Sequence, residues 1–376
     1  MTDFPFRPTV EQLSDLRADV APISDIQQQF RANDAAHLVV NDRVAHQYQI
    51  AGGKVLLRIE SQLPDSLRGV GLFQPESGYT GIARISTGLG CPHNENLPDF
   101  LGIRLAFRTP TGRRVDFLGI NDPASPTDTH FQFIKLLEAT AGAAGSGFVP
   151  GDLKLLASLT RSLGLVQGGE TFTHIVRQTL RTTLSTTAYQ TYWTGIEETG
   201  GPPAKFVIDP VTDENPVRIG LHDDHHLTAE WRERQARGPI EFNLYWLSFI
   251  GHDATSLVRL TRGWQEDRHL VGHLTFPQCD HTTPDARLWA ALAAEMGANP
   301  GNWVHDRDDT ILQPATEFGV ARKLAYERSQ AGRDALPETA YASVFENGTI
   351  DPGLQDLLNV RRSQKRREGH IDAAPD

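Results

Sequence analysis

The sequence predicts an α+β fold in which an antiparallel β-barrel is surrounded by helices. Short strand-like segments, separated by Gly, Pro and Asp turns, run from Leu38 to Asn121, and a second set runs from Thr191 to Phe276. Helically spaced apolar residues lie before, between and after the two sets. Because the chain of 376 residues has no internal repeat and no long low-complexity linker, we expect one intertwined unit.

The N-terminal part of the chain contains the first helices and the first sheet. Residues 9–35 repeat apolar side chains at helical spacing, which predicts an arm or helix pair that wraps the main body. The strand-like runs follow. Thr109-Pro110-Thr111-Gly112 separates two of these runs and is typical of a hairpin connection, so we expect a meander that closes into a barrel.

Later helices are predicted by the same spacing over residues 131–168, 284–297 and 316–332. The Gly- and Ala-rich segment 141–147 interrupts the first of them. We interpret it as a loop, because its glycines match neither dinucleotide- nor nucleotide-binding spacing. The polar segment 352–376 is expected to fray.

Composition indicates a globular protein that binds no nucleic acid. The formal net charge is -11, and the only concentrated basic run is Arg361–Arg367, which we interpret as a solvated tail or helix end. Two cysteines, Cys91 and Cys279, cannot form a disulfide framework, which favours a reducing compartment. The N-terminus does not resemble a secretory signal, and no apolar run approaches the ~20 residues needed to span a membrane. We therefore expect a cytoplasmic protein.

One face of the predicted helix near the C-terminus carries an unusual combination of side chains. At 100° per residue, Arg322, Tyr326 and Arg333 fall within about 40° of one another. A phenol titrates near 10 when unperturbed, and a cation one turn away favours its anionic form. The face is thus suited to a tyrosinate bound to haem iron, with the second Arg placed to meet a haem propionate. Taken alone, the segment would be an ordinary surface helix.

Three upstream motifs support a functional interpretation of this helical face. They are Arg43-Val44-Ala45-His46, Ala83-Arg84-Ile85-Ser86-Thr87 and Phe117-Leu118-Gly119-Ile120-Asn121-Asp122-Pro123. With the Arg322 and Tyr326 pair of the helix they make four motifs, which in order and approximate spacing resemble the signature of haem catalases. The likeness covers roughly residues 40–335. Leu63-Pro64, Gly71-Leu72-Phe73 and the segment 99–102 resemble the small catalase-related subfamily.

The resemblance implies a catalase-like antiparallel β-barrel, with haem b (iron protoporphyrin IX) buried between the barrel and the C-terminal ligand helix. It divides the chain into an N-terminal helical arm (1–36), a catalase-like haem domain (37–335) and a C-terminal tail (336–376). The chain departs from the family after His46, where Gln47-Tyr48-Gln49 replaces the usual Ala-Lys-Gly.

Each motif residue then has an expected role. A neutral imidazole moves the peroxide proton near pH 7, and an amide orients the peroxide. By the resemblance, Ser86 hydrogen-bonds the imidazole. The expected distal catalytic pair is His46 and Asn121, with Ser86 as the third catalytic residue. The propionates are expected to be bound by Arg43, Arg84 and Arg333. Tyr326 is expected to bind the iron, Arg322 to stabilise the phenolate, and Phe131 or Phe133 to stack on the porphyrin.

The predicted function is a haem-dependent peroxidase or catalase that cleaves hydrogen peroxide or organic hydroperoxides, with an unidentified electron donor; a homodimer is left open. The first alternative is a fatty-acid hydroperoxide isomerase or dehydratase similar to allene oxide synthases, which place a Thr before the distal His where this chain has Ala45. An alternative of another class is a non-catalytic β-barrel that binds an apolar ligand or a partner protein.

A rival constellation is His222-Asp223-Asp224-His225-His226, with Glu230 nearby. These side chains are the right donors for zinc or non-haem iron. Five consecutive ligands cannot all point one way on a strand or a helix, so we interpret the segment as a polar loop.

Overall fold

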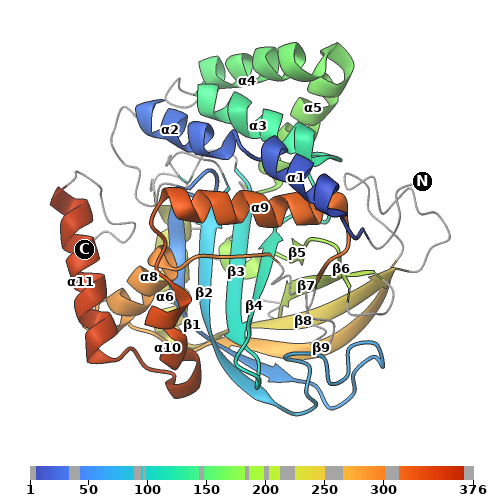
Figure 1. Ribbon diagram of the computed structural model, residues 1–376. Helices are drawn as coiled ribbons and strands as arrows, with labels where there is room; N and C mark the ends of the chain where they lie inside the picture. The colour runs from blue at the N-terminus through green and yellow to red at the C-terminus, as the bar shows by residue number, and fades with distance from the viewer. Residues whose placement is uncertain are drawn as a thin grey trace.

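The computed structural model describes residues 6–33, 43–88, 95, 99–143, 148–182, 186–198, 203–211, 225–249, 266–300 and 313–367. In Figure 1 a curved sheet forms the centre of the molecule, one long helix crosses it, and further helices stack beyond that helix. A cavity lies between the sheet and the crossing helix.

The strands form a closed antiparallel barrel, which confirms the predicted fold class. Eight strands take part, and they are β1 (Gln49–Ile59), β2 (Gly78–Thr87), β3 (Leu101–Arg108), β4 (Arg114–Ile120), β5 (Tyr192–Thr194), β7 (Ala204–Pro210), β8 (Ile240–Phe249) and β9 (Glu266–Phe276). Their order is β7-β5-β4-β3-β2-β1-β9-β8, and β8 pairs back onto β7 to close the ring. Two short strands, β6 (Glu197–Glu198) and β10 (Gln313–Pro314), extend the sheet beside β7.

The barrel interior is filled with aromatic side chains. The ring of Phe206 lies 4.9 Å from that of Phe117 and 5.0 Å from that of Trp246, centroid to centroid. Successive strand residues point to opposite faces. On β3, Leu105 therefore joins the barrel core while its neighbour Arg104 points outward. Because the interior is packed, polar side chains of the strands gather on the outer face.

A helical layer covers that outer face. It consists of α1 (Val10–Asp19), α2 (Ile23–Asn33), α3 (His130–Ala143), α4 (Phe148–Leu163), α5 (Leu165–Thr182) and α9 (Glu317–Gly332). Apolar side chains of α1, α2, α3 and α9 form one buried cluster, in agreement with the predicted arm. Figure 1 shows α9 against β2–β4, with α1–α5 beyond it. The helical region that was predicted to end at residue 168 continues to Thr182, the last residue of α5.

The remaining helices lie beside the barrel. They are α6 (His226–Arg237), α8 (Pro284–Glu295), α10 (Ala342–Asn347) and α11 (Pro352–Arg367), with 3-10 turns at Thr187–Tyr189 and Glu338–Ala340. The fraying predicted from residue 352 onward is wrong for Pro352–Arg367, which forms a helix. Leu354 and Leu358, one turn apart, are buried in a cluster with side chains of α8.

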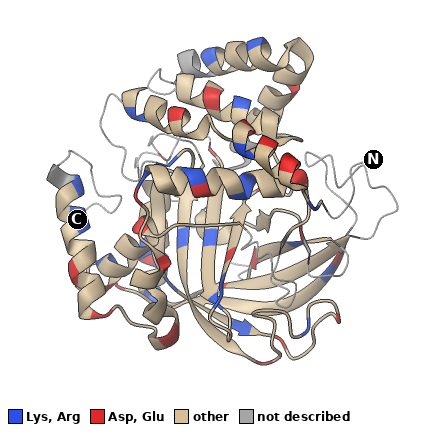
Figure 2. Ribbon diagram, in the orientation of Figure 1, with Lys and Arg blue, Asp and Glu red and all other residues tan. Residues whose placement is uncertain are grey.

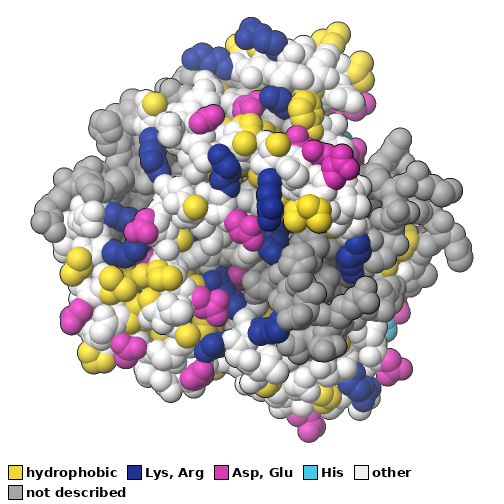
Figure 3. All heavy atoms as spheres, viewed as in Figure 1, with side chains coloured by type: hydrophobic (Ala, Val, Ile, Leu, Met, Phe, Trp, Pro, Cys, Tyr) yellow, Lys and Arg dark blue, Asp and Glu magenta, His cyan; other side chains and the backbone are white. Residues whose placement is uncertain are grey.

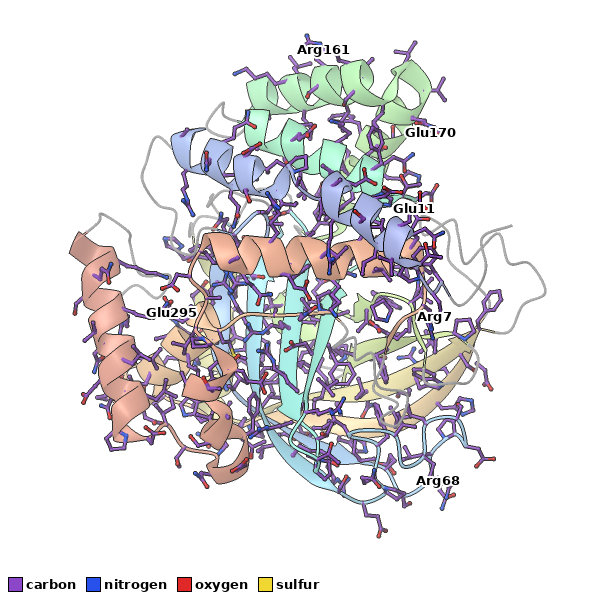
Figure 4. All side chains as sticks on the ribbon, in the orientation of Figure 1. Arg7, Glu11, Arg68, Arg161, Glu170 and Glu295 are labelled. Carbon is purple, nitrogen blue, oxygen red and sulfur yellow. The ribbon has the colours of Figure 1, made fainter. Side chains whose placement is uncertain are left out.

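The basic run near the C-terminus is also not a free tail over its described part. Glu295, labelled in Figure 4, lies at the end of α8 and accepts hydrogen bonds from Lys365 Nζ (2.5 Å) and Arg361 Nη1 (3.3 Å). Arg361 also pairs with Asp334 at 3.0 Å. These ion pairs attach α11 to the molecule. On the face in Figure 3, basic and acidic side chains are interspersed. None of the described helices combines the length and apolar character that crossing a membrane requires.

Candidate functional site

A cavity of about 260 Å³ lies between the outer face of the barrel and the helical layer. Its walls come from the segment before β1, from β2, β3 and β4, and from α3 and α9. Figure 2 shows Lys and Arg positions both on α9 and on the strands behind it. Most predicted site residues meet here, which are Arg43, His46, Arg84, Ser86, Phe133, Arg322, Tyr326 and Arg333.

His46 occupies a strained backbone position. It lies in the segment before β1 rather than in a strand, with φ at +58°, a value that L-residues other than Asn, Asp and His rarely adopt. Its N–H donates to the Gly88 carbonyl at 3.0 Å. Its ring lies against Gly102, where an added Cβ would stand 2.4 Å from the imidazole Cε1. A glycine at 102 is therefore what allows the ring to reach the cavity.

The electrostatics of His46 keep it neutral. His46 is half-buried and lines the cavity. Burial, reinforced by the charge of Arg84, lowers the pKa of His46 to about 4. Ser86 Oγ lies 3.2 Å from His46 Nδ1, which holds the plane of the ring and leaves Nε2 for other partners. This matches the role expected of Ser86.

The lowered pKa of His46 makes a prediction about stability. The unfolded imidazole, with a pKa near 6.5, binds protons that the folded one does not, so stability falls as the pH drops from about 6.5 to 4. The loss attributable to His46 reaches about 3 kcal/mol. Urea unfolding of the apoprotein at pH 7 and pH 4.5 should show this loss in the wild type and not in His46→Gln. Parallel pH dependence of the two proteins would contradict the assignment.

The predicted shared face of Arg322, Tyr326 and Arg333 is present in the structure. Arg322 and Tyr326 lie on α9, and Arg333 is its C-terminal capping residue. The Arg322 guanidinium carbon lies 5.9 Å from the centre of the Tyr326 ring, and all three residues line the cavity. Thr316 caps the start of α9 by accepting a hydrogen bond from Gly319 N at 3.1 Å. The phenol and two guanidinium groups therefore face the same space as His46.

Four arginines line this cavity, three of them buried and Arg333 half-buried: Arg43, Arg84, Arg104 and Arg333. Arg43, Arg84 and Arg104 are each less than a tenth exposed. Some of their hydrogen-bond acceptors are backbone carbonyls: Ala294 O accepts from Arg43 Nη2 at 2.8 Å, and His46 O accepts from Arg84 Nη2 at 2.7 Å.

Among the described residues, the charge of Asp116 acts on Arg104 and that of Glu295 on Arg333, and neither acid forms an ion pair with Arg43 or Arg84. Burial and the charges of neighbouring arginines lower the pKa of Arg84 to about 9 and that of Arg43 well below its usual value. Within the described part of the chain, Arg43 Nε and two nitrogens of Arg104 have no hydrogen-bond partner. Buried charged donors without acceptors are costly, so the cluster is suited to a ligand that carries carboxylates.

Asn121 does not lie where its expected role requires. Its Oδ1 accepts from Leu101 N at 2.8 Å, and its Nδ2 donates to Gln190 Oε1 at 3.2 Å. The amide thus ties the start of β3 to the segment before β5, and Asn121 is not part of the cavity wall, whereas Ile120 is. The placement does not support the role of peroxide donor. Side-chain alternation at the end of β4 turns Ile120, not Asn121, toward the cavity.

The two candidate phenylalanines lie in different environments. Phe131 is 52% exposed, its ring lies beneath the Lys135 ammonium, and it is not part of the cavity wall, so the structure does not bring it to the other predicted site residues. Phe133 lines the cavity, with its ring edge-on to that of Phe318 at 5.6 Å.

The rival metal constellation receives no support from the described residues. Residues 222–224 lie outside them. His225 Nδ1 hydrogen-bonds Tyr48 OH at 3.0 Å, and Glu230 pairs with Arg234 at 2.5 Å. The described part of the chain contains no group of three or more His, Cys, Asp or Glu arranged to hold a metal ion.

Three residues of the site were missed in the sequence. Arg104 and Gly102 lie on β3, and Ile120 ends β4. A signal for Arg104 was present, because a charged residue inside the otherwise apolar run Leu101–Phe107 marks the outward face of a strand. Nothing local distinguishes Gly102 or Ile120.

Comparisons with known proteins concern the fold. The sequence matches no protein-family model, and no curated protein is a detectable relative. Among solved structures, it is similar to a bacterial catalase (TM-score 0.62, 17% identity), a fungal catalase (0.59, 14%) and catalase A from Saccharomyces cerevisiae (0.57, 12%).

The matches cover 79%, 78% and 82% of this chain and 58%, 60% and 63% of those chains, in the same order. The chain thus spans about six-tenths of the length of the catalases it resembles. At this identity the likeness establishes the fold, and the chain has the catalase fold.

Proposed function

We propose that the protein is a haem-dependent peroxidase or catalase, acting on hydrogen peroxide or organic hydroperoxides. The observation that carries this proposal is the arginine cluster with buried, unpartnered nitrogens, in the same cavity as a tyrosine on α9 and a neutral histidine. Core side chains fill the barrel interior, and the cavity lies on its outer face. Buried guanidinium groups without partners there favour an anionic ligand such as haem over an apolar one.

The residues present fit haem b. Tyr326 would hold the iron through its phenolate, and the Arg322 charge beside the ring would stabilise that anion. Arg43, Arg84 and Arg333 would bind the propionates by charge-assisted hydrogen bonds. Phe133 would contribute an apolar wall. Bound haem would supply the redox-active iron that the protein's own side chains lack.

His46 would move the peroxide proton. In its neutral form it accepts the proton from one peroxide oxygen and returns it to the other, which leaves as water or an alcohol. Ser86 holds the imidazole in one orientation during both transfers. With Asn121 outside the cavity wall, His46 is the distal residue on which proton transfer depends.

The walls of the cavity favour a peroxide that carries an apolar group. Ile120 from β4 and Leu136 from α3 contribute, as do Leu155 from α4 and Ile175 from α5. The small Ala45 beside His46 leaves further room. These walls support organic hydroperoxides as well as hydrogen peroxide. They equally suit the runner-up, a fatty-acid hydroperoxide isomerase. Cytoplasmic location and a homodimer stay predictions.

Haem loading and peroxide turnover test the proposal directly. The protein expressed with haem precursor should be coloured, with a ferric haem spectrum, and should oxidise a reducing dye with hydrogen peroxide or tert-butyl hydroperoxide. A colourless protein that takes up no haemin would contradict the proposal. Conversion of a fatty-acid hydroperoxide to an epoxide without dye, and no dye oxidation with the other two peroxides, would favour the runner-up.

A further inference from the structure

We propose that Arg104 is a fourth cofactor-binding arginine, which binds a carboxylate of the haem. This inference rests on the proposed function and adds a residue that the sequence motifs do not contain. Arg104 lies in the middle of β3, whereas the three predicted propionate ligands lie before β1, on β2 and at the end of α9.

The strand register places Arg104 beside a predicted ligand. In the antiparallel pair of β2 and β3, Arg84 and Arg104 are direct partners. Directly opposite residues share a face of the sheet, and here that face is the outer one. Arg104 lines the same cavity as Arg84, Arg43 and Arg333.

The hydrogen bonds of Arg104 leave part of its guanidinium unused. Nη1 donates to the carbonyls of Met296 (3.2 Å) and Gly297 (3.4 Å). Arg104 is only 5% exposed, so water does not readily reach its guanidinium. Its Nε and Nη2 are buried and have no hydrogen-bond partner among the described residues. These two nitrogens lie on the same edge of the guanidinium plane, the edge that matches the two oxygens of a carboxylate.

The nearby acid does not neutralise Arg104. Asp116 is engaged by Arg114 at 2.7 Å and by Asn299 N at 2.9 Å. Burial, with the charge of Arg114 next, lowers the pKa of Arg104 to about 10, so the group is still charged at neutral pH. A buried charge with unpartnered donors, facing a cavity, is stabilised when an anion enters.

The alternative is that Arg104 only holds the Met296 and Gly297 carbonyls in place. Arg114 provides a matched comparison, because its Nη2 also donates to the Gly297 carbonyl but its side chain is not part of the cavity wall. A purely structural role predicts similar consequences for both arginines. A carboxylate-binding role predicts an effect that depends on the haem carboxylates.

The experiment compares haem and an uncharged analogue. Protein loaded with haemin, or with haemin dimethyl ester, is mixed with excess apomyoglobin, and the rate of porphyrin loss is followed by absorbance. Arg104→Leu should lose haemin about tenfold faster than the wild type, because a charge-assisted bond is removed. It should lose the ester at the wild-type rate. Arg104→Lys should lie between, and Arg114→Lys should release both porphyrins like the wild type.

Each other outcome has a distinct meaning. Unchanged haemin loss from Arg104→Leu, or equal acceleration of haemin and ester, would overturn the role of Arg104 and leave the proposed function standing. A wild type that binds neither porphyrin would instead contradict the proposed function. Circular dichroism and thermal unfolding confirm that each variant is folded, and Arg104→Gln replaces the leucine variant if that one is not.

Discussion

Tyr326→Phe is expected to lose the spectrum of a phenolate-bound ferric haem and to bind haem at least ~100-fold more weakly. Removing a direct ligand of the iron should cost more affinity than removing a residue that only hydrogen-bonds such a ligand. The substitution removes the phenol oxygen of Tyr326, a residue that lines the cavity beside Arg322, and keeps the ring. Absorbance spectra of the loaded protein and titration of the apoprotein with haemin measure the two effects.

Tyr245→Phe is the matched control for this variant. Tyr245 lies on β8 under the Arg268 guanidinium, at 3.9 Å, and is not part of the cavity wall. Its loss should leave the spectrum and the haem affinity unchanged. If Tyr326→Phe binds haem with the wild-type spectrum, Tyr326 is not the iron ligand, even if the protein is a haem enzyme.

His46→Ala is expected to retain haem and to slow peroxide cleavage at least ~100-fold, the usual effect of removing a general acid-base residue. The cavity keeps its arginines and Tyr326, so cofactor binding has no reason to fail. Stopped-flow mixing of the loaded variant with hydrogen peroxide measures the slowed step. Asn121 does not line the cavity and its side chain is engaged by Leu101 N, so it is not expected to replace the imidazole.

His273→Ala serves as the control for that experiment. His273 hydrogen-bonds Glu60 at 2.7 Å and Asn243 at 2.9 Å, and it does not line the cavity. It should cleave peroxide at the wild-type rate. Wild-type turnover by His46→Ala would remove His46 from the mechanism and leave the haem proposal intact.

Local periodicity explains which features of the fold were predictable. Alternation along β2 places Arg84 and Ser86 on one face, and the 3.6-residue turn of α9 aligns Arg322 with Tyr326. Both relations are properties of a single element. The barrel class followed from the same alternation, repeated along two sets of strands.

The errors arose where one element meets another. Leu354 and Leu358 on α11 form only a short apolar pair, and the fraying prediction failed because α8 offers them a surface and supplies Glu295 for the basic side chains. Phe131 and Phe133 are equivalent in the sequence, but the packing of α3 against its neighbours turns one to solvent and the other to the cavity.

The barrel and the shared helical face of Arg322 and Tyr326 were predictable from the sequence, because both depend on local periodicity. The contact between Ser86 and His46, which are 40 residues apart, was expected only from the resemblance to haem catalases. Tertiary structure alone decided that Ile120 rather than Asn121 lines the cavity, that Gly102 makes room for the imidazole, and that Arg104 lies opposite Arg84. The physical reason is strand register, since pairing between distant segments, set by the whole barrel, decides which side chains share a face.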